Sequence, residues 1–391
     1  MTNAVIVDAV RTPGGKRGGK LAGWHPADLA GELLRALVTR NDLDPALVED
    51  VIMGCVTQAG AQSTNIGRFA VLAAGFPESV CATTIDRQCG SSQQANTFAA
   101  QAIMSGFHDV VIAAGVEVMS AVPMGSNYSN GPGVIFGPGV TERYRQAGGL
   151  VNQGISAEMI ADRWKLSRED LDAFSLRSQR LARIARDEGR FEREIIPVAS
   201  ISADGTAPGE VVISDEGIRA TTMEGLAALK PAFKEDGKVT AGNSSQITDG
   251  ASATLIMSEA MANHLGLKPR ARFVSFALAG VDPVTMLTGP IPATTKVLER
   301  AKLSLSDIDL IEINEAFASV VLAWEKEIHP DMERVNVNGG AIALGHPLGA
   351  SGAKLTATLL CELERTGKRY GLQTMCEGGG MANATIIERL G

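Results

Sequence analysis

The 391-residue sequence has few aromatic side chains and only scattered cysteines, and each shortage excludes a class of protein. Aromatic residues make up 4% of the chain beside 43 glycines, a balance that favours a compact α/β protein over an all-β sandwich. The five cysteines stand singly at positions 55, 81, 89, 361 and 376, with no Cys-x-x-Cys pair. The spacing therefore predicts neither a metal site nor a disulfide framework.

Basic residues and long apolar runs are scarce as well. The chain has 36 Lys and Arg against 44 Asp and Glu, and the net charge of −8 argues against a nucleic-acid-binding protein. It leaves room for one local basic pocket for an anionic ligand. No uncharged window approaches the length of a spanning helix, and the first residues do not form a secretion signal. We therefore expect a cytoplasmic protein with reduced thiols and no membrane partner.

Short apolar runs alternate with longer helical patterns, and this alternation predicts an α/β fold. Expected strands cover residues 4–7, 51–54, 83–85, 110–113, 253–257, 271–279, 310–314, 334–337 and 384–387. Expected helices cover residues 27–39, 66–73, 91–105, 291–301 and 350–365.

The two ends of the chain look alike, whereas the middle breaks the pattern. Residues 37–54 and 298–314 both run from a helix end through a polar turn into a strand, which indicates an internal duplication, with a chance match as the alternative. Residues 119–242 begin with a Gly- and Pro-rich loop and then form a helix that Ser167 caps and Gly189 ends. We interpret this stretch as an insertion in the first half.

Cys89 lies between a predicted strand and a predicted helix. A thiol at a helix N-terminus feels the helix dipole, and we expect this dipole to lower its pKa. Gly90, Ser91 and Ser92 are small, so a ligand has room to approach. For an isolated cysteine, the alternative is a buried structural thiol.

Two further turns supply partners for such a thiol. His346 is set among glycines and apolar residues, which is how a chain presents an imidazole base to a cleft, although a hydrogen-bonded core histidine is the alternative. Cys376 precedes three glycines whose backbone N–H groups suit an oxyanion site, and its thiol is a candidate acid or base. Asn314 follows an apolar strand, where its amide can donate to an oxygen. Together these residues form a plausible nucleophile–base–acid set.

These motifs, in this order, resemble the thiolases over essentially the whole chain, and most closely the bacterial degradative ones. The matching segments are residues 10–13, 87–91, 115–120, 240–250, 314–318, 339–349 and 376–380. The resemblance implies two similar five-stranded α/β domains stacked as five layers (αβαβα), with an inserted loop domain that binds coenzyme A. It also implies a homodimer or homotetramer. The expected domains are residues 1–118 with 243–268, the loop domain 119–242, and residues 269–391.

The resemblance also implies roles for individual residues. Cys89 is the nucleophile, His346 activates it, and Cys376 is the acid/base that acts on the acetyl-CoA carbon. Asn314 and His346 correspond to one oxyanion hole, and the backbone N–H groups of Cys89 and Gly378 to a second. The positions that match coenzyme A contacts or a wall of the site are Arg219, Ser245 and Phe317.

The implied function is cleavage of 3-ketoacyl-CoA with coenzyme A, or the reverse Claisen condensation, with no permanently bound cofactor. The alternatives are an acetoacetyl-CoA-specific enzyme, a catalytically silent CoA- or lipid-binding relative, a condensing enzyme for carrier-protein thioesters, and a dithiol redox protein. Four positions depart from the family pattern: Asp86, Thr248, Ala382 and Gly225. Gly225 stands where a serine often contacts coenzyme A, so that contact is not expected here. Asn152-Gln153-Gly154 replaces the His-Met-Gly of short-chain enzymes, which favours a broad or medium-chain substrate.

Overall fold

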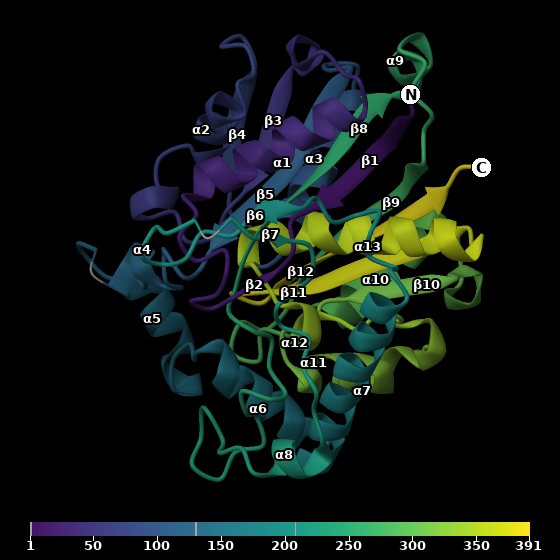
Figure 1. The fold of residues 1–391 in the computed structure, drawn as a ribbon. Helices are drawn as coiled ribbons and strands as arrows, with labels where there is room; N and C mark the ends of the chain where they lie inside the picture. The colour runs from purple at the N-terminus through teal and green to yellow at the C-terminus, as the bar shows by residue number, and fades with distance from the viewer. Residues whose placement is uncertain (1, 130, 208) are drawn as a thin grey trace.

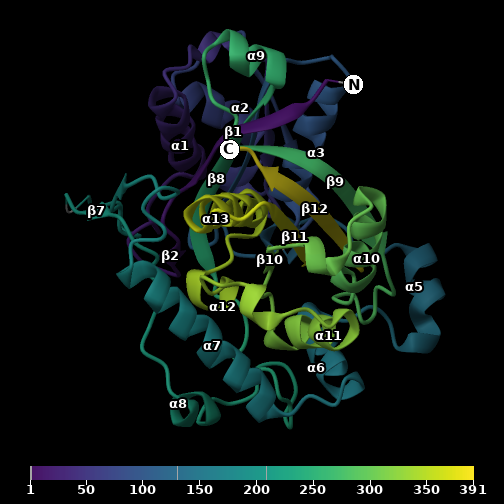
Figure 2. The same cartoon turned by 90° about the vertical axis from the view of Figure 1, so that its right-hand side faces the viewer.

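A computed structural model describes residues 2–129, 131–207 and 209–391 of the chain (Figures 1 and 2). The strands are β1 (Ala4–Arg11), β2 (Gly15–Lys16), β3 (Asp50–Gly54), β4 (Cys81–Ile85), β5 (Val110–Val118), β6 (Val198–Ala199), β7 (Val211–Val212), β8 (Thr248–Ser258), β9 (Ala271–Gly280), β10 (Leu310–Ile313), β11 (Tyr370–Glu377) and β12 (Met381–Arg389). The helices are α1 (Pro26–Arg40), α2 (Ile66–Ala73), α3 (Ser91–Met104), α4 (Ser126–Ser129), α5 (Pro138–Tyr144), α6 (Gln153–Arg163), α7 (Arg168–Asp187), α8 (Met223–Ala227), α9 (Glu259–His264), α10 (Pro290–Ala301), α11 (Ala318–Ile328), α12 (Ala341–Leu344) and α13 (Ser351–Thr366).

The two halves of the chain each build one half of a mixed sheet. The order is β10-β11-β12-β9-β1-β8-β5-β3-β4, so β9 to β12 stand together and β1, β8, β5, β3 and β4 follow. The halves join where Val5 and Ile6 of β1 pair with Arg272 and Ala271 of β9. The family resemblance implied two similar α/β domains, and this short ladder connects their sheets.

Helices cover the sheets in layers, as the resemblance implied. The helices α3 and α13 pack on each other and on strands of both halves, so they form the central layer (Figure 2). The helices α1 and α2 cover the outer face of the first half, and α10 and α11 cover the outer face of the second. The result is the αβαβα order.

The strand expected at residues 334–337 is wrong, and within the described residues the second half of the sheet has four strands rather than five. Val335 makes only an isolated bridge to Ile311. The chain cannot stay extended here because Asn336 has a φ of 46°, in the left-handed region. That conformation lets the Asn336 side chain bond the backbone N–H and C=O of Ile313, at 2.9 Å each.

Residues 119–242 form the segment with α4 to α8 and the β6–β7 pair, and α6, α7 and α8 lie at the end of the molecule farthest from α9 (Figure 1). The predicted Ser167 cap of α7 is confirmed, and Asp170 completes it as a capping box. The stretch 120–149, expected to be loop, contains the short helices α4 and α5.

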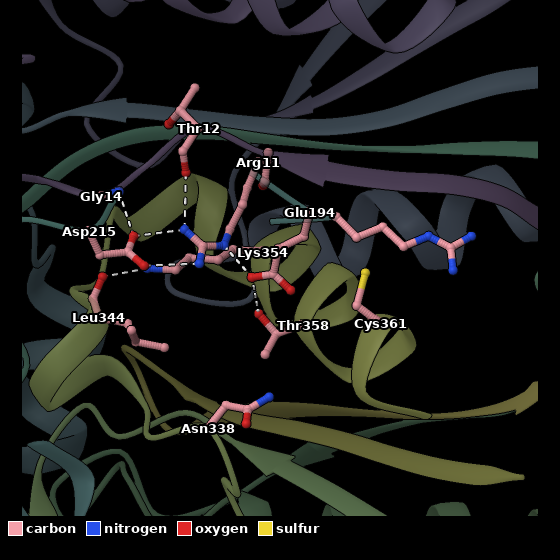
Figure 3. A network of polar contacts seen from close by, with 12 residues as sticks. Arg11, Thr12, Gly14, Glu194, Asp215, Asn338, Leu344, Lys354, Thr358 and Cys361 are labelled. Carbon is pink, nitrogen blue, oxygen red and sulfur yellow. Dashed lines mark hydrogen bonds and ion pairs between the residues drawn. The ribbon is translucent and has the colours of Figure 1, made fainter. Parts of the chain in front are cut away.

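A buried ion cluster ties this segment to both halves of the core (Figure 3). The Arg11 guanidinium of β1 binds Asp215 with contacts of 2.7 and 3.0 Å and Glu194 with a contact of 2.6 Å. Glu194 also accepts a hydrogen bond from Thr358 of α13 at 2.9 Å. Asp215 and Glu194 both belong to residues 119–242, so the bidentate Arg11 pair fixes the segment against β1 and α13. The motif around Arg11 is therefore structural.

Candidate active site

Cys89 occupies a tight turn between β4 and α3. The residue before it, Gln88, has a φ of 50°, and such a left-handed backbone is uncommon for a residue other than glycine. Gly90 follows as the N-cap of α3, so Cys89 lies just outside the helix. Its side chain is only 4% exposed and belongs to an apolar cluster with Leu348, two residues beyond His346.

Hydrogen-bond donors from three segments converge on the Cys89 thiol. They are the side chain of Gln153 in α6 and the backbone N–H groups of Gly378 and of Cys89 itself, and each favours the thiolate. Burial and the charge of Glu377 outweigh them and raise the pKa of Cys89 to about 12. The expectation that the helix dipole gives Cys89 a low pKa is therefore wrong. The resting residue is a thiol that needs a base.

Cys376 is completely buried on β11, and it lies close enough to Cys89 for a charge on Cys89 to oppose its ionisation. Burial, Cys89 and Glu377 raise the pKa of Cys376 well above its ordinary value. A thiol that holds its proton this firmly is suited to donate it only to a strong base, such as a carbanion or enolate.

His346 is 3% exposed, and its ring nitrogens have distinct partners. Ser351 Oγ donates to Pro347 O at 2.9 Å, so its 2.5 Å contact with His346 uses an N–H on Nδ1. That tautomer leaves the lone pair on Nε2, where it accepts a long hydrogen bond from Asn314 Nδ2 at 3.4 Å. Burial and the nearby Lys354 lower the pKa of His346 to about 3. His346 is therefore neutral at physiological pH and able to accept a proton.

Two buried carboxylates hold the turns that carry His346 and Asn314. Glu117 accepts the backbone N–H of Gly349 at 2.9 Å, and it also bonds the N–H groups of residues 56 and 57. Glu315 accepts the backbone N–H of Ile342 at 3.2 Å and the amide of Asn336 at 3.0 Å. Neither carboxylate is free for chemistry, because each serves several backbone or amide donors.

The predicted coenzyme A residues fall into two groups. The backbone N–H of Ser245 bonds to the carbonyl of Ala316, which places it beside Phe317. Phe317 meets Phe233 edge-on, with ring centroids 6.0 Å apart, and a Cβ at Gly154 would lie 2.2 Å from Phe233. This aromatic wall therefore reaches α6 beside Gln153.

Arg219 is exposed and lies on a different segment from Ser245. On that segment, the carbonyl of Gly217 accepts a hydrogen bond from the side chain of Gln246, the residue after Ser245, at 3.0 Å. The role of Arg219 in coenzyme A binding therefore stays a prediction.

Across the described parts of the chain, no group of three or more His, Cys, Asp and Glu side chains is arranged to hold a metal ion. Within those same residues, no helix combines the length and the apolar character that crossing a membrane requires. All five cysteines are free.

Comparison with known families decides the identity. Residues 4–260 match the family model described as thiolase, N-terminal domain, and residues 267–389 match that described as thiolase, C-terminal domain. The chain belongs to the thiolase family. Its relatives include the steroid 3-ketoacyl-CoA thiolase FadA6 of Mycobacterium tuberculosis, 53% identical over 100% of this chain and 95% of the relative. A 3-ketoacyl-CoA thiolase of Aliivibrio fischeri is 47% identical over 100% of both chains.

Solved structures agree. The acetyl-CoA acetyltransferase of Bacillus anthracis superimposes with a TM-score of 0.90 at 42% identity, over 100% of this chain and 99% of that one. The thiolase fold is therefore confirmed, and the enzyme is an acyltransferase, an acetyl-CoA C-acyltransferase of the thiolase type.

Sequence analysis of this thiolase missed four residues that the structure places in or beside the site. Gln153 was noted only as a departure from a short-chain motif, yet its amide reaches the Cys89 thiol. Ser351 fixes the His346 tautomer, and its spacing of five residues from the histidine on a turn entering a helix was an available signal. Phe233 and Glu377 had no local signal, because their contacts come from distant segments.

The low pKa of His346 predicts a specific sensitivity of this thiolase to acid. Between pH 6.5, the ordinary pKa of histidine, and pH about 3, its pKa in the native state, the unfolded chain binds a proton at this residue and the native state does not. The free energy of unfolding therefore falls as the pH falls through this window. At pH 4.5 this histidine alone should cost about 3 kcal/mol of the free energy of unfolding. Denaturant unfolding at pH 7 and 4.5 should therefore show a smaller acid loss in His346→Asn than in the wild type. Equal losses would contradict the prediction.

Proposed function

We propose that the enzyme cleaves 3-ketoacyl-CoA with coenzyme A to acetyl-CoA and a shortened acyl-CoA, or runs the reverse condensation, through an acyl-Cys89 intermediate. The observation that carries this proposal is the convergence on one buried thiol of a second thiol, Cys376, and the backbone N–H groups of Cys89 and Gly378. A structural cysteine needs no such donors, whereas a nucleophile that becomes acylated does.

The steps follow from the protonation states. His346 Nε2 accepts the Cys89 proton as sulfur attacks the 3-keto carbon, and the donors stabilise the negative oxygen. The C2–C3 bond then breaks, its electrons pass into the acetyl-CoA enolate, and the Cys376 thiol protonates the enolate carbon. The thiol of a second coenzyme A gives its proton to the Cys376 thiolate and attacks acyl-Cys89. Cys89 leaves and takes back the proton held on His346, which restores the starting enzyme. Asn314 with His346, and Cys89 with Gly378, supply the two oxyanion holes.

Rapid mixing with acetyl-CoA tests this function directly. We expect a burst of free coenzyme A equal to the enzyme concentration and a 1:1 acetyl adduct on the peptide that carries Cys89, found by mass spectrometry. A catalytically inactive CoA- or lipid-binding relative would bind acetyl-CoA without forming the adduct. A condensing enzyme for carrier-protein thioesters would form no adduct from the CoA ester.

Coenzyme A binding belongs, in our proposal, to the loop domain 119–242 and the segment that follows it. Ser245 and the Phe233–Phe317 wall lead from the surface toward Gln153, which suits the narrow pantetheine arm. Arg219 is exposed on the neighbouring segment, where a guanidinium suits the phosphates. We retain residues 1–118 with 243–268 and residues 269–391 as the two core domains.

We further propose a cytoplasmic homodimer or homotetramer. The strand β4 is an edge of the sheet, and Cys81 and Thr83 on it are exposed. Beside it, Phe69 and Leu72 of α2 are 46% and 44% exposed. An unpaired strand edge next to apolar side chains favours pairing with a second copy. Five free thiols agree with a reducing compartment.

The acyl chain is the finer question, and we propose a broad or medium-chain preference. Asn152 and Gln153 replace the histidine–methionine pair that marks acetoacetyl-CoA enzymes, although Met286 remains buried near the C-terminal core. We expect kcat/KM for thiolysis to rise from the four-carbon to the six-carbon 3-ketoacyl-CoA, by up to roughly four-fold per added carbon at ~0.8 kcal/mol per methylene. A steep fall at six carbons would return the enzyme to the acetoacetyl-CoA class.

The 53% identity to a steroid 3-ketoacyl-CoA thiolase favours a second candidate, a bulky ring-bearing acyl group. The same thiolysis series therefore includes one 3-ketoacyl-CoA ester with a fused-ring side chain. A kcat/KM for that ester above every straight-chain value would select the second candidate.

A further inference from the structure

Glu377 is a buried acid that the mechanism above does not use. It is the last residue of β11, adjacent to Cys376, and its side chain is completely buried. Its carboxyl rests against the catalytic turn, since a Cβ added at Gly90 would lie 2.0 Å from Oε1. Among the described residues, neither carboxyl oxygen has a hydrogen-bond partner. An acid left without any donor is costly to keep ionised and points to a role beyond packing.

The groups around Glu377 do little to stabilise the negative charge of its ionised carboxyl. From the turn after β4 it faces Arg87, whose Nε also lacks a partner within the described parts of the chain, and the exposed Asp86. From β12, Asn383 gives its amide to the carbonyl of Gly90 at 3.0 Å rather than to the carboxyl. Burial, opposed by Arg87 and assisted by Asp86, raises the pKa of Glu377 to about 8. It therefore loses its proton before either catalytic thiol does.

We propose that Glu377 is a positioning residue that controls how readily the catalytic thiols ionise: neutral, it permits thiolate formation at Cys89, and ionised, it suppresses it. Both thiols feel this acid, and its negative charge raises the pKa of each. The inference rests on the proposed function, in which Cys89 is the nucleophile. Its consequence is an alkaline limit on activity set by a carboxyl group rather than by a thiol or a histidine.

The test measures the alkylation rate of each cysteine by iodoacetamide between pH 7 and 10, in the purified full-length enzyme, by mass spectrometry of the peptides. Glu377→Gln keeps the shape of the side chain and removes its charge. We expect Cys89 in this variant to react about ten-fold faster than in the wild type near pH 9. A fall of about one unit in the pKa of Cys89 raises the fraction of thiolate about ten-fold. Free N-acetylcysteine in the same buffers calibrates the reagent at each pH.

Asp86→Asn is the matched control. It removes one negative charge from the turn after β4, at a solvent-exposed position, and it keeps the Oδ1 that accepts the Gln88 N–H at 2.6 Å. Solvent screens that charge, so the alkylation rate of Cys89 should stay within about two-fold of the wild type.

The pH profile of kcat/KM gives a second measurement on Glu377→Gln. The rise of kcat/KM from acid to neutral pH should be unchanged in this variant, while its fall above pH 8 should move to higher pH.

Three results would overturn the inference. They are an unchanged Cys89 profile in Glu377→Gln, a rate lowered equally at every pH, and an equal acceleration in Asp86→Asn. If Glu377→Gln does not fold, infrared difference spectra of the wild type between pH 7 and 10 decide instead, and the absence of a titrating protonated carboxyl rejects the role. Failure of the proposed function is separate, because it would appear as no alkylation or acylation of Cys89 in any variant.

Discussion

Replacing Cys89 by serine should abolish both thiolysis and condensation while the fold stays intact. The side chain is buried, and the substitution changes one atom, so the turn between β4 and α3 has little to adjust. The chemistry changes far more, because the pKa of a serine hydroxyl is too high for one neutral imidazole to ionise it. We expect kcat/KM to fall by about 10⁴-fold or more, with no acetyl adduct on the enzyme.

The control for this variant is Cys81→Ser, which makes the same change at an exposed thiol on β4 and should keep wild-type activity. Circular dichroism and the denaturation midpoint of both variants should match those of the wild type. Residual activity above about 1% in Cys89→Ser, with the acetyl adduct relocated to another cysteine, would mean that the nucleophile has been misassigned.

The second large effect is expected at Cys376. Its thiol is buried beside Cys89, and burial together with the charges nearby favours its protonated form, which suits an acid that acts on carbon. Cys376→Ala should therefore still form acetyl-Cys89 from acetyl-CoA. It should lose the exchange of the acetyl-CoA methyl protons with solvent, by about 10³-fold, along with overall turnover.

Proton exchange is followed by NMR in deuterated buffer, and acetylation by mass spectrometry of the same sample. Cys361→Ala serves as the control, since it removes another buried thiol, on α13, outside the catalytic turns. Methyl exchange at the wild-type rate in Cys376→Ala would remove this residue from the mechanism. Loss of acetylation as well would place it in the acylation step instead.

Local sequence patterns determined much of this enzyme. The helices α2, α3 and α7 lie within one or two residues of their predicted bounds, because apolar spacing, caps and terminating glycines act over a single turn. The turns that carry Cys89, His346 and Cys376 were found for the same reason: small residues and glycines mark them within a few positions of the reactive group. The family resemblance rests on these turns.

Only the tertiary structure decided how these groups ionise and what supports them. The pKa of Cys89 is raised, not lowered, because burial and Glu377 are properties of packed segments nearly 300 residues apart in the chain. The amide of Gln153 reaches the thiol from a helix in the inserted segment. Asn336 leaves the extended conformation, and its side chain satisfies the buried backbone groups of Ile313 in β10. A local sequence pattern does not show which distant segments will pack against a residue. The pKa shifts of these buried groups depend on that packing, because it sets their burial and the charges beside them.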